Sequence, residues 1–264
     1  MELKYTGFHR LLEIDHYSHQ RDSWQIHLFN EIEVDRIEAL REAFKKKGLK
    51  APSYTAFVMK GIAQAIAEFR PKYPQINSFL KNWFGFKSIV VFDGISAGCS
   101  VALDHEDAVS VGVVQEPQSK SLMTITEELV QISNPNHQSV KNLVFFFRLP
   151  RLLQRFLHEV SKRSTKMRYE NRGTFCINPV GKFGVDAHLS LPQTSCLQFG
   201  MGVIRDRVVA RKGVPLVVKT FYLTVSFDRR LMNGRPCAML MERIQKILNQ
   251  AEFDDWKKME LSDR

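Results

Sequence analysis

Four cysteines are the residues of this 264-residue chain whose side chains could act as nucleophiles or bind a soft metal. Cys99, Cys176, Cys196 and Cys237 stand singly, without a Cys-x-x-Cys pair and without a histidine at the spacing of a zinc site. We therefore interpret them as reduced, buried, small hydrophobic side chains and expect no metal centre. Cys176 and Cys237 stay open as catalytic thiols only because each lies beside a polar motif.

Two polar motifs carry the other side chains that could meet a substrate. The stretch DRRLMNG at 228–234 follows a strand-like run, and GTFCINPVGKFG occupies 173–184. They contain the guanidinium of Arg229 and the amides of Asn178 and Asn233. The pKa of an arginine lies above about 12, so Arg229 can bind an anion at neutral pH but cannot accept a proton.

Composition indicates one soluble domain spanning residues 1–264. The chain has 44% hydrophobic residues, enough for a substantial core, and no internal repeat or Pro/Gly/Ser-rich linker divides it. No uninterrupted apolar run reaches the roughly 18 residues of a membrane-spanning helix. The first 30 residues carry charges throughout and lack the apolar core of a signal peptide. We therefore expect a cytoplasmic protein.

The net charge of +10 favours anionic partners. Nucleic acid, an acidic membrane surface and a phosphorylated ligand all fit this charge, and charge alone does not choose among them. The basic residues are not interleaved with the glycine and aromatic motifs of the common nucleic-acid-binding modules. We therefore expect no nucleic-acid partner.

The first third of the chain predicts one strand and two helices. Residues 23–34 alternate apolar and polar residues, as a half-buried strand does. Asp35 then occupies an N-cap position before an amphipathic helix that Gly48 closes. Ser53 is placed to cap a second helix, apolar on several sides and ended by Pro71, which we expect in the core.

Strands dominate the rest of the chain. Val- and Ile-rich runs at 86–103 and 108–117 predict strands, as does 195–204. Helices are expected at Thr124–Ile132 and from Arg235 to about Ala251. Strands and helices do not alternate regularly, which indicates an α+β fold with a mixed sheet covered on one side by helices.

In this order the motifs resemble those of the dihydrolipoamide acyltransferase catalytic domain of 2-oxo acid dehydrogenase complexes. More distantly, they resemble chloramphenicol acetyltransferase. The family's Asp-His-Arg-x-x-(Asp/Asn)-Gly motif corresponds to residues 228–234, and its Gly-Thr-Phe-Thr-Ile-Ser-Asn-Leu-Gly run begins at Gly173. Pro192-Gln193 and the Pro-x-x-Asn at 74–77 also match, so the resemblance covers nearly the whole chain. It implies a chloramphenicol acetyltransferase-like, trimer-forming fold; assembly into a larger cage stays open.

The resemblance also implies a reaction, in which an acyl group passes between the thiols of coenzyme A and dihydrolipoamide. The motif histidine takes the thiol proton, a hydroxyl of the Thr-Ile-Ser run binds the oxyanion, and the site lies between subunits. Carried to this chain, the base position is Arg229 and the oxyanion position is Asn178, while Asn233 falls within the family's own variation. Coenzyme A or another anionic acyl ligand is the implied cofactor, with no metal.

The substitution at the base position breaks the pattern. A general base contributes about 10²–10⁴ to the rate and an oxyanion donor about 10²–10³. Arg229 cannot replace the histidine, whereas the Asn178 amide can still donate. Two interpretations of Arg229 stay open, an ion pair with a nearby carboxylate and an anion clamp at the channel mouth. Asn178 is alternatively a turn residue before Pro179.

Three other side chains could take over the lost chemistry. His27 lies on the expected first strand and His188 follows the glycine-rich run, and each is alternatively an ordinary core or surface histidine. Cys176 lies two residues before Asn178, and therefore on the same face of a strand. A redirected nucleophile there is the less favoured interpretation.

Residues 134–172 form a basic, apolar insertion that looks longer than the family's connection. Nine Lys/Arg and two Glu between Lys141 and Arg172 surround the run VFFFRLPRLLQRFLHEV. This composition is typical of an interfacial amphipathic helix. We nevertheless expect the segment to pack over the sheet or a neighbouring subunit, because Pro150 would kink a continuous surface helix. Under that expectation, Phe146→Asp or Leu153→Asp unfolds the protein.

Two functional hypotheses follow. The chain is an acyltransferase-fold protein that binds coenzyme A or an acyl thioester, with the usual histidine-based transfer lost or rerouted, hence a pseudoenzyme. Alternatively, it is a non-enzymatic trimeric scaffold or regulator on an acyltransferase complex or a membrane surface. A transferase with another base and acceptor stays open as well. No lipoyl domain is recognised, so we expect any acyl carrier to act in trans.

Overall fold

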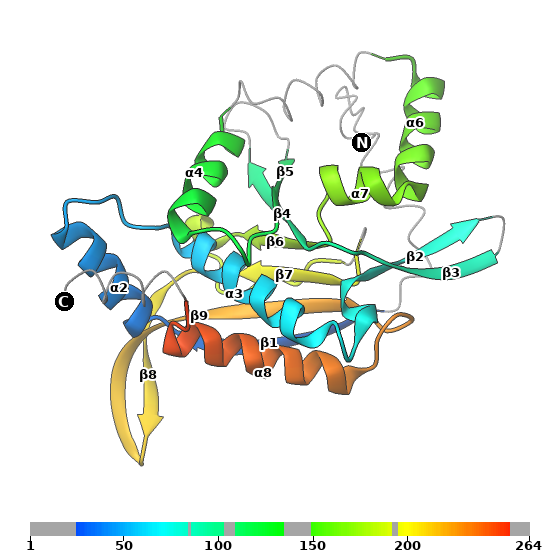
Figure 1. Ribbon diagram of the computed structural model, residues 1–264. Coiled ribbons are helices and arrows are strands. Elements are labelled where there is room, and N and C mark those ends of the chain that lie inside the picture. Colours follow the sequence, from blue (N-terminus) through cyan, green and yellow to red (C-terminus); the bar gives the residue numbers. More distant parts are fainter. Residues whose placement is uncertain (1–24, 84–85, 103–108, 135–148, 192–194, 254–264) are drawn as a thin grey trace, which may run out of the picture.

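The computed structural model describes residues 25–83, 86–102, 109–134, 149–191 and 195–253, and these form an α+β fold (Figure 1). Seven strands form one mixed sheet in the order β1-β9-β7-β6-β4-β5, with β8 paired to β9. The strands of this sheet are β1 (Gln25–Glu33), β4 (Ser96–Ala102), β5 (Val109–Gln115), β6 (Phe175–Pro179), β7 (Leu197–Met201), β8 (Arg205–Arg211) and β9 (Val214–Asp228). Only the pairs β4–β6 and β6–β7 are parallel. The expected mixed sheet is confirmed.

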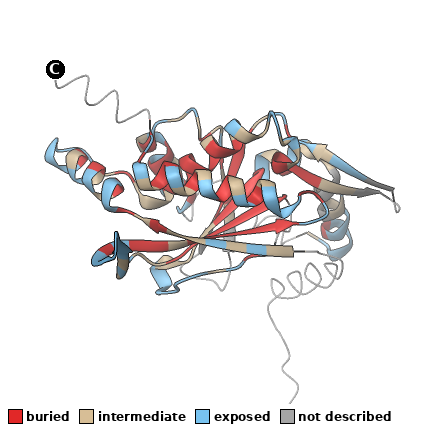
Figure 2. Cartoon of the chain, turned by 90° about the horizontal axis from the view of Figure 1, so that it is seen from below, coloured by how far each residue is buried: buried red, intermediate tan, exposed pale blue. Residues whose placement is uncertain are grey.

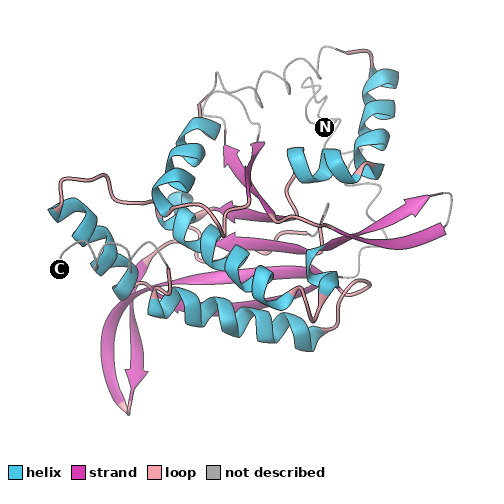
Figure 3. Cartoon of the chain, in the orientation of Figure 1, coloured by secondary structure: helices cyan, strands magenta, loops and turns pink. Residues whose placement is uncertain are grey.

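Helices and a separate hairpin complete the described chain (Figure 3). The helices are α2 (Asp35–Lys46), α3 (Tyr54–Phe69), α4 (Leu122–Ile132), α6 (Arg151–Arg163), α7 (Thr165–Asn171) and α8 (Gly234–Gln250), with short 3₁₀ turns η1 (Pro74–Asn77) and η2 (Gly181–Phe183). Strands β2 (Ser78–Trp83) and β3 (Phe86–Val91) pair only with each other. No helix among these residues is long and apolar enough to cross a membrane.

The core lies between one face of the sheet and a layer built on α3 and α8. Figure 2 shows buried residues along the sides of these helices that meet the sheet. From the sheet, Phe175, Ile177 and Phe199 enter this core, and Ile62 and Ile244 enter it from the two helices. Because successive side chains of a strand alternate faces, the residues between them in sequence point to the opposite face of the sheet.

The four expected helix starts lie within two residues of their predicted positions. Ser53 caps α3 as expected, accepting a hydrogen bond from the Ala56 amide at 3.2 Å. The third helix begins at Leu122, two residues before the expected Thr124, because Ser121 caps it. The Asp35 prediction was wrong, since Val34 holds the N-cap and Asp35 is the first helical residue. An acid in the first turn still interacts favourably with the helix dipole.

Candidate active site

A row of polar side chains crosses the sheet on the face opposite α3 and α8. Cys176 on β6 pairs with Gln198 on β7, which pairs with Ser226 on β9, which pairs with His27 on β1. We call these four residues the polar row. Cys176, Gln198 and Ser226 are buried, whereas His27 is exposed at the edge strand. The row therefore joins residues nearly 200 positions apart on one surface.

Asn178 lies in the neighbouring row of the same face. It pairs with Gly200, which pairs with Thr224 on β9. The alternative interpretation of Asn178 as a turn residue was wrong, because β6 continues through Pro179. The turn chemistry of an Asn-Pro pair is overridden here by pairing to β7. Cys176 shares this face, as its spacing of two residues predicted.

The Asn178 amide is fully engaged in the single chain. Its Oδ1 accepts a hydrogen bond from the Ser100 hydroxyl, and its Nδ2 donates to Ser190 Oγ at 2.6 Å and to the Phe199 carbonyl at 3.5 Å. The Thr224 hydroxyl donates to the His188 carbonyl at 2.5 Å, which fixes the same loop to the sheet. Asn178 therefore ties the loop that carries Ser190 to the strands. To stabilise an oxyanion, its amide would have to give up one of these bonds.

An ion pair within the 228–234 motif links two of its residues. Arg230 and Asp228 form an ion pair, with Arg230 Nη2 at 2.7 Å from Asp228 Oδ2. Arg229 is exposed and has no hydrogen bond or ion pair within the part of the chain that the structure describes. Of the two interpretations of Arg229, an ion pair with a carboxylate of its own motif is not formed, because Arg230 takes the adjacent carboxylate, whereas an ion pair across a subunit interface stays a prediction. Asn233 is the exposed N-cap residue of α8 and makes no side-chain capping bond.

Within one chain the two motif positions do not face each other. Asn178 aligns with Thr224 across β7, and Arg229 follows directly after Asp228, the last residue of β9, which lies four residues beyond Thr224. Four strand residues span about 13 Å. A reacting group about 3 Å from both positions is excluded by that separation in the monomer. Any joint site needs a second subunit.

His27 does not have the geometry of a replacement base. Its Nδ1 lies 2.7 Å from Ser226 Oγ, and Ser226 is completely buried with no other partner among the described residues. If the buried hydroxyl donates its proton, which avoids an unsatisfied donor, Nδ1 of His27 accepts it and the ring proton of the neutral imidazole lies on Nε2. The exposed nitrogen is then a hydrogen-bond donor, which cannot take a proton from a thiol.

Burial makes all four thiols poor nucleophiles. It raises the pKa of Cys176 to about 11 and the pKa values of Cys99 and Cys237 to about 12. The pKa of Cys196 is raised further for the same reason. The prediction of reduced, buried cysteines is confirmed. Among the described residues no cluster of His, Cys, Asp and Glu could hold a metal.

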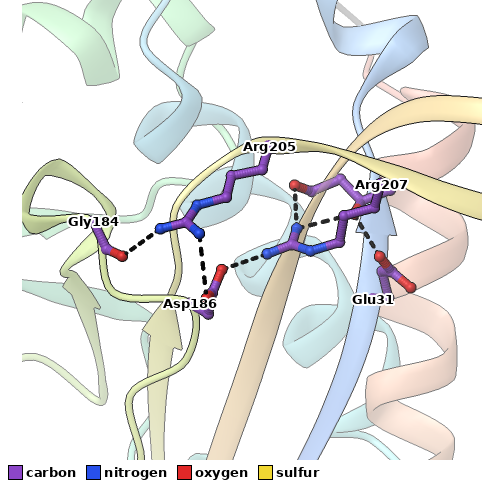
Figure 4. Close-up of polar contacts among 6 residues, drawn as sticks. Glu31, Gly184, Asp186, Arg205 and Arg207 are labelled. Atoms are coloured by element: carbon purple, nitrogen blue, oxygen red, sulfur yellow. Dashed lines mark hydrogen bonds and ion pairs between the residues drawn. The ribbon is translucent and has the colours of Figure 1, made fainter.

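An ion-pair network that the sequence did not reveal anchors the loop after η2 (Figure 4). Asp186 accepts from Arg207 Nη2 at 2.6 Å and lies 3.6 Å from Arg205 Nη1. Arg205 Nη2 also donates to the Gly184 carbonyl at 2.8 Å. The network fastens the start of the loop that reaches Ser190, and hence the Asn178 contact, to β8. The sequence did not predict that Arg205 and Arg207 anchor this loop, because two arginines on an exposed strand have no characteristic pattern.

The family of the chain is decided by its match to known sequences. The model of the 2-oxoacid dehydrogenases acyltransferase (catalytic domain) matches residues 17–142 and 146–253. The chain belongs to this family. The lipoamide acyltransferase component of the branched-chain alpha-keto acid dehydrogenase complex of Bacillus subtilis is 25% identical over 231 residues, covering 84% of this chain and 46% of the relative. A probable dihydrolipoyllysine-residue succinyltransferase of Schizosaccharomyces pombe is 22% identical over 83% of this chain and 43% of its own length.

Solved acyltransferase structures share the fold. A probable dihydrolipoamide acetyltransferase of Listeria monocytogenes superposes with a TM-score of 0.70 at 20% identity, covering 95% of this chain and 94% of the other. The dihydrolipoamide acetyltransferase of Azotobacter vinelandii gives 0.70 at 18% identity, covering 94% and 92%. The predicted acyltransferase fold is therefore confirmed. The acyltransferase-family chain spans less than half the length of the two curated relatives above.

Proposed function

We propose that this acyltransferase-family chain binds coenzyme A or an acyl thioester between subunits of a homotrimer, with the histidine-based transfer lost. The observation that carries the proposal is Arg229, an exposed guanidinium at the base position of an otherwise ordered motif. The Azotobacter enzyme has been studied for the catalytic roles of a serine, a histidine and an asparagine, the last two four positions apart. Arg229 and Asn233 have the same spacing.

The side chains of the polar row favour loss of the acyl-transfer reaction over a reaction that uses another residue as the base. Among the described residues on this face, His27 presents a donor and Cys176 is a buried thiol of raised pKa. Neither is arranged to remove a proton from coenzyme A or an acceptor thiol. Asn178 has its amide committed to Ser100 and Ser190. Binding can persist in such a site while the proton transfer that drives the reaction is absent.

Exposed apolar strands support the trimer. Val208 on β8 and Val217 on β9 pair with each other and are each 70% exposed, whereas Phe29 on β1, 65% exposed, lies opposite Thr224, seven residues farther along β9. Apolar side chains gathered on neighbouring strands are typical of subunit interfaces. One structure of similar fold is the cubic core of a pyruvate dehydrogenase multienzyme complex. We propose a trimer here on the separation of Arg229 from Asn178 and leave larger assemblies to experiment.

In the trimer, Arg229 is proposed as the anion clamp. A guanidinium offers five donors in a fixed plane and stays charged at all working pH values, which suits phosphate and carboxylate groups. Coenzyme A supplies phosphates, and some acyl groups supply a carboxylate. The net charge of +10 draws such anions to the protein as a whole.

Calorimetric titration of the full chain with coenzyme A and acetyl-coenzyme A tests the proposal. We expect binding below about 1 mM and a roughly tenfold weaker affinity for Arg229→Ala, which is 1.4 kcal/mol. Arg235→Ala is the matched control, because Arg235 is exposed on α8 just beyond the motif. A crystal structure with coenzyme A in the channel would locate the ligand. No binding of either compound would contradict the proposal and favour a non-enzymatic scaffold.

A further inference from the structure

Helix α6 carries an uncovered apolar stripe. Leu152, Phe156 and Val160 recur every four residues, which places them on one side of the helix. Their exposed fractions are 82%, 63% and 40%. Leu153, beside them, is 42% exposed. The apolar side of α6 is therefore not covered within the single chain, and packing of this segment against a neighbouring subunit stays a prediction; Phe146 lies outside the described residues.

A local hydrogen bond stabilises the start of the helix. Gln154 is buried and donates from Nε2 to the Leu149 carbonyl at 2.7 Å. Pro150 does not kink the helix, because it stands at the N-cap and α6 begins after it. Proline is well tolerated at the start of a helix, where no backbone donor is missed. The reason for expecting a packed segment therefore does not apply to the residues that follow Pro150.

The charges near the stripe are predominantly basic. Arg151 and Arg155 are exposed on α6, about a third of a turn or more from the apolar stripe. Lys166 on the adjoining α7 is exposed and lies 3.9 Å from the carboxylate of Glu170, and Met167 is 37% exposed. An apolar side bearing Leu and Phe together with a polar side bearing Arg is the pattern of helices that lie in the plane of a membrane interface.

The stripe by itself is too small to form a stable protein interface. A helix of 13 residues is about 20 Å long and about 10 Å wide, so one side offers about 200 Å². A stable protein interface buries about 800 Å² on each partner. A lipid surface has no such minimum, because a single amphipathic helix enters the headgroup region by itself. We propose that the α6 stripe docks on an anionic lipid bilayer surface.

Vesicle sedimentation with the full-length chain tests this inference, which is independent of the coenzyme A proposal. Vesicles of phosphatidylcholine with about 30% phosphatidylserine should bind at least tenfold more protein than phosphatidylcholine alone. Raising the salt from 0.1 to 0.5 M should release most of it, because salt shortens the Debye length from about 10 Å. Phe156→Asp and Leu152→Asp should each lose at least tenfold in binding.

Val130→Asp is the matched control, since Val130 is a 55% exposed apolar residue on another helix, α4. It should bind vesicles like the unaltered protein. All three variants should have melting temperatures within a degree or two of that of the unaltered protein. If Phe156→Asp is unstable, Leu152→Asp decides the test, because Leu152 is 82% exposed and contributes little to the interior. Equal binding to both vesicle types would overturn the inference. So would intact binding in the α6 variants, or absent binding together with a change in oligomeric mass on Phe156→Asp.

Discussion

The guanidinium of Arg230 forms an ion pair with the carboxylate of Asp228, which lies two residues earlier in the sequence. Arg230 Nη2 lies 2.7 Å from Oδ2, Nε lies 3.0 Å from Oδ1, and the Arg230 amide donates to Oδ1 at 2.9 Å. Asp228 is 6% exposed. Arg229 stands between them without such a contact among the described residues. The motif therefore contains a structural pair, Asp228 and Arg230, on either side of Arg229, the residue that the resemblance to the family places at the base position.

This division predicts opposite effects for two neighbouring substitutions. Asp228→Asn removes the charge of a buried carboxylate that accepts hydrogen bonds from the partly exposed Arg230 guanidinium, so unfolding free energy should fall by about 1–3 kcal/mol. Arg229→Ala removes an exposed side chain and should change it by less than about 0.5 kcal/mol. Urea denaturation measures both. Equal losses would mean that Arg229 also supports the fold.

The cysteines should resist alkylation in the native protein. Because burial raises the pKa of Cys176 to about 11, only about one thiol in a thousand is ionised at pH 8. Iodoacetamide at that pH should leave all four native thiols unmodified and label four after denaturation. The raised pKa values stabilise the fold below the ordinary thiol value of about 8.5, and this contribution is lost as the pH rises toward 11. Rapid labelling of native Cys176 would revive the nucleophile that we disfavour.

His27→Gln tests whether the polar row supplies a base. Glutamine retains an N–H donor of similar reach but cannot act as a base. If the exposed nitrogen of His27 is a donor, the substitution should change any residual acyl transfer by less than about threefold. A general base is worth about 10²–10⁴, so a loss of that size, with an unchanged melting temperature, would identify His27 as the rerouted base.

Light scattering should show three copies of the 30.5 kDa chain in one particle. Val217→Asp places a charge on a 70% exposed strand residue and should weaken the trimer, since an uncompensated charge in an interface costs several kcal/mol. Lys212→Asp, at the exposed tip of the same hairpin, is the control. A stable monomer at micromolar concentration would remove the shared-site explanation of Arg229 and Asn178.

Local patterns in the sequence were sufficient for most of the fold. Ser53 and the apolar helix after it, the closing helix and the strand-rich second half all carry short-range signals of capping and periodicity. The prediction of Asp35 as the N-cap residue was wrong because the strand before it continues directly into the helix, and Val34 is the N-cap residue. Resemblance located Arg229 and Asn178 but not their surroundings.

Long-range pairing fixed what the sequence left open. Asn178 was readable as a turn residue because Asn-Pro is a local signal, whereas its strand state depends on β7, about 20 residues later. The His27–Ser226 contact depends on the register of β1 against β9. The Asp186 network and the exposure of α6 likewise depend on which surfaces the tertiary fold leaves uncovered. None of these relations has a short-range signature.

Introducing a histidine at position 229 tests whether a base alone is sufficient for transfer, because the Asp228–Arg230 ion pair around that position is present. Arg229→His should raise transfer from acetyl-coenzyme A to dihydrolipoamide only weakly, by less than about tenfold. The amide of Asn178 remains tied to Ser100 and Ser190, and a lost oxyanion donor alone costs about 10²–10³. Adding Asn178→Ser should raise the rate further. Full recovery from the single change would show that Asn178 already serves as the oxyanion donor.

The rate of acetyl transfer from acetyl-coenzyme A to dihydrolipoamide by the unaltered protein tests the central claim most directly. It should be measured beside a relative that has the histidine, at equal concentrations of trimer. We predict a rate at least about 10²-fold below the relative, because Arg229 cannot accept the thiol proton. Turnover of a few per second or more, typical of enzymes, would contradict the account and show that another residue acts as the base.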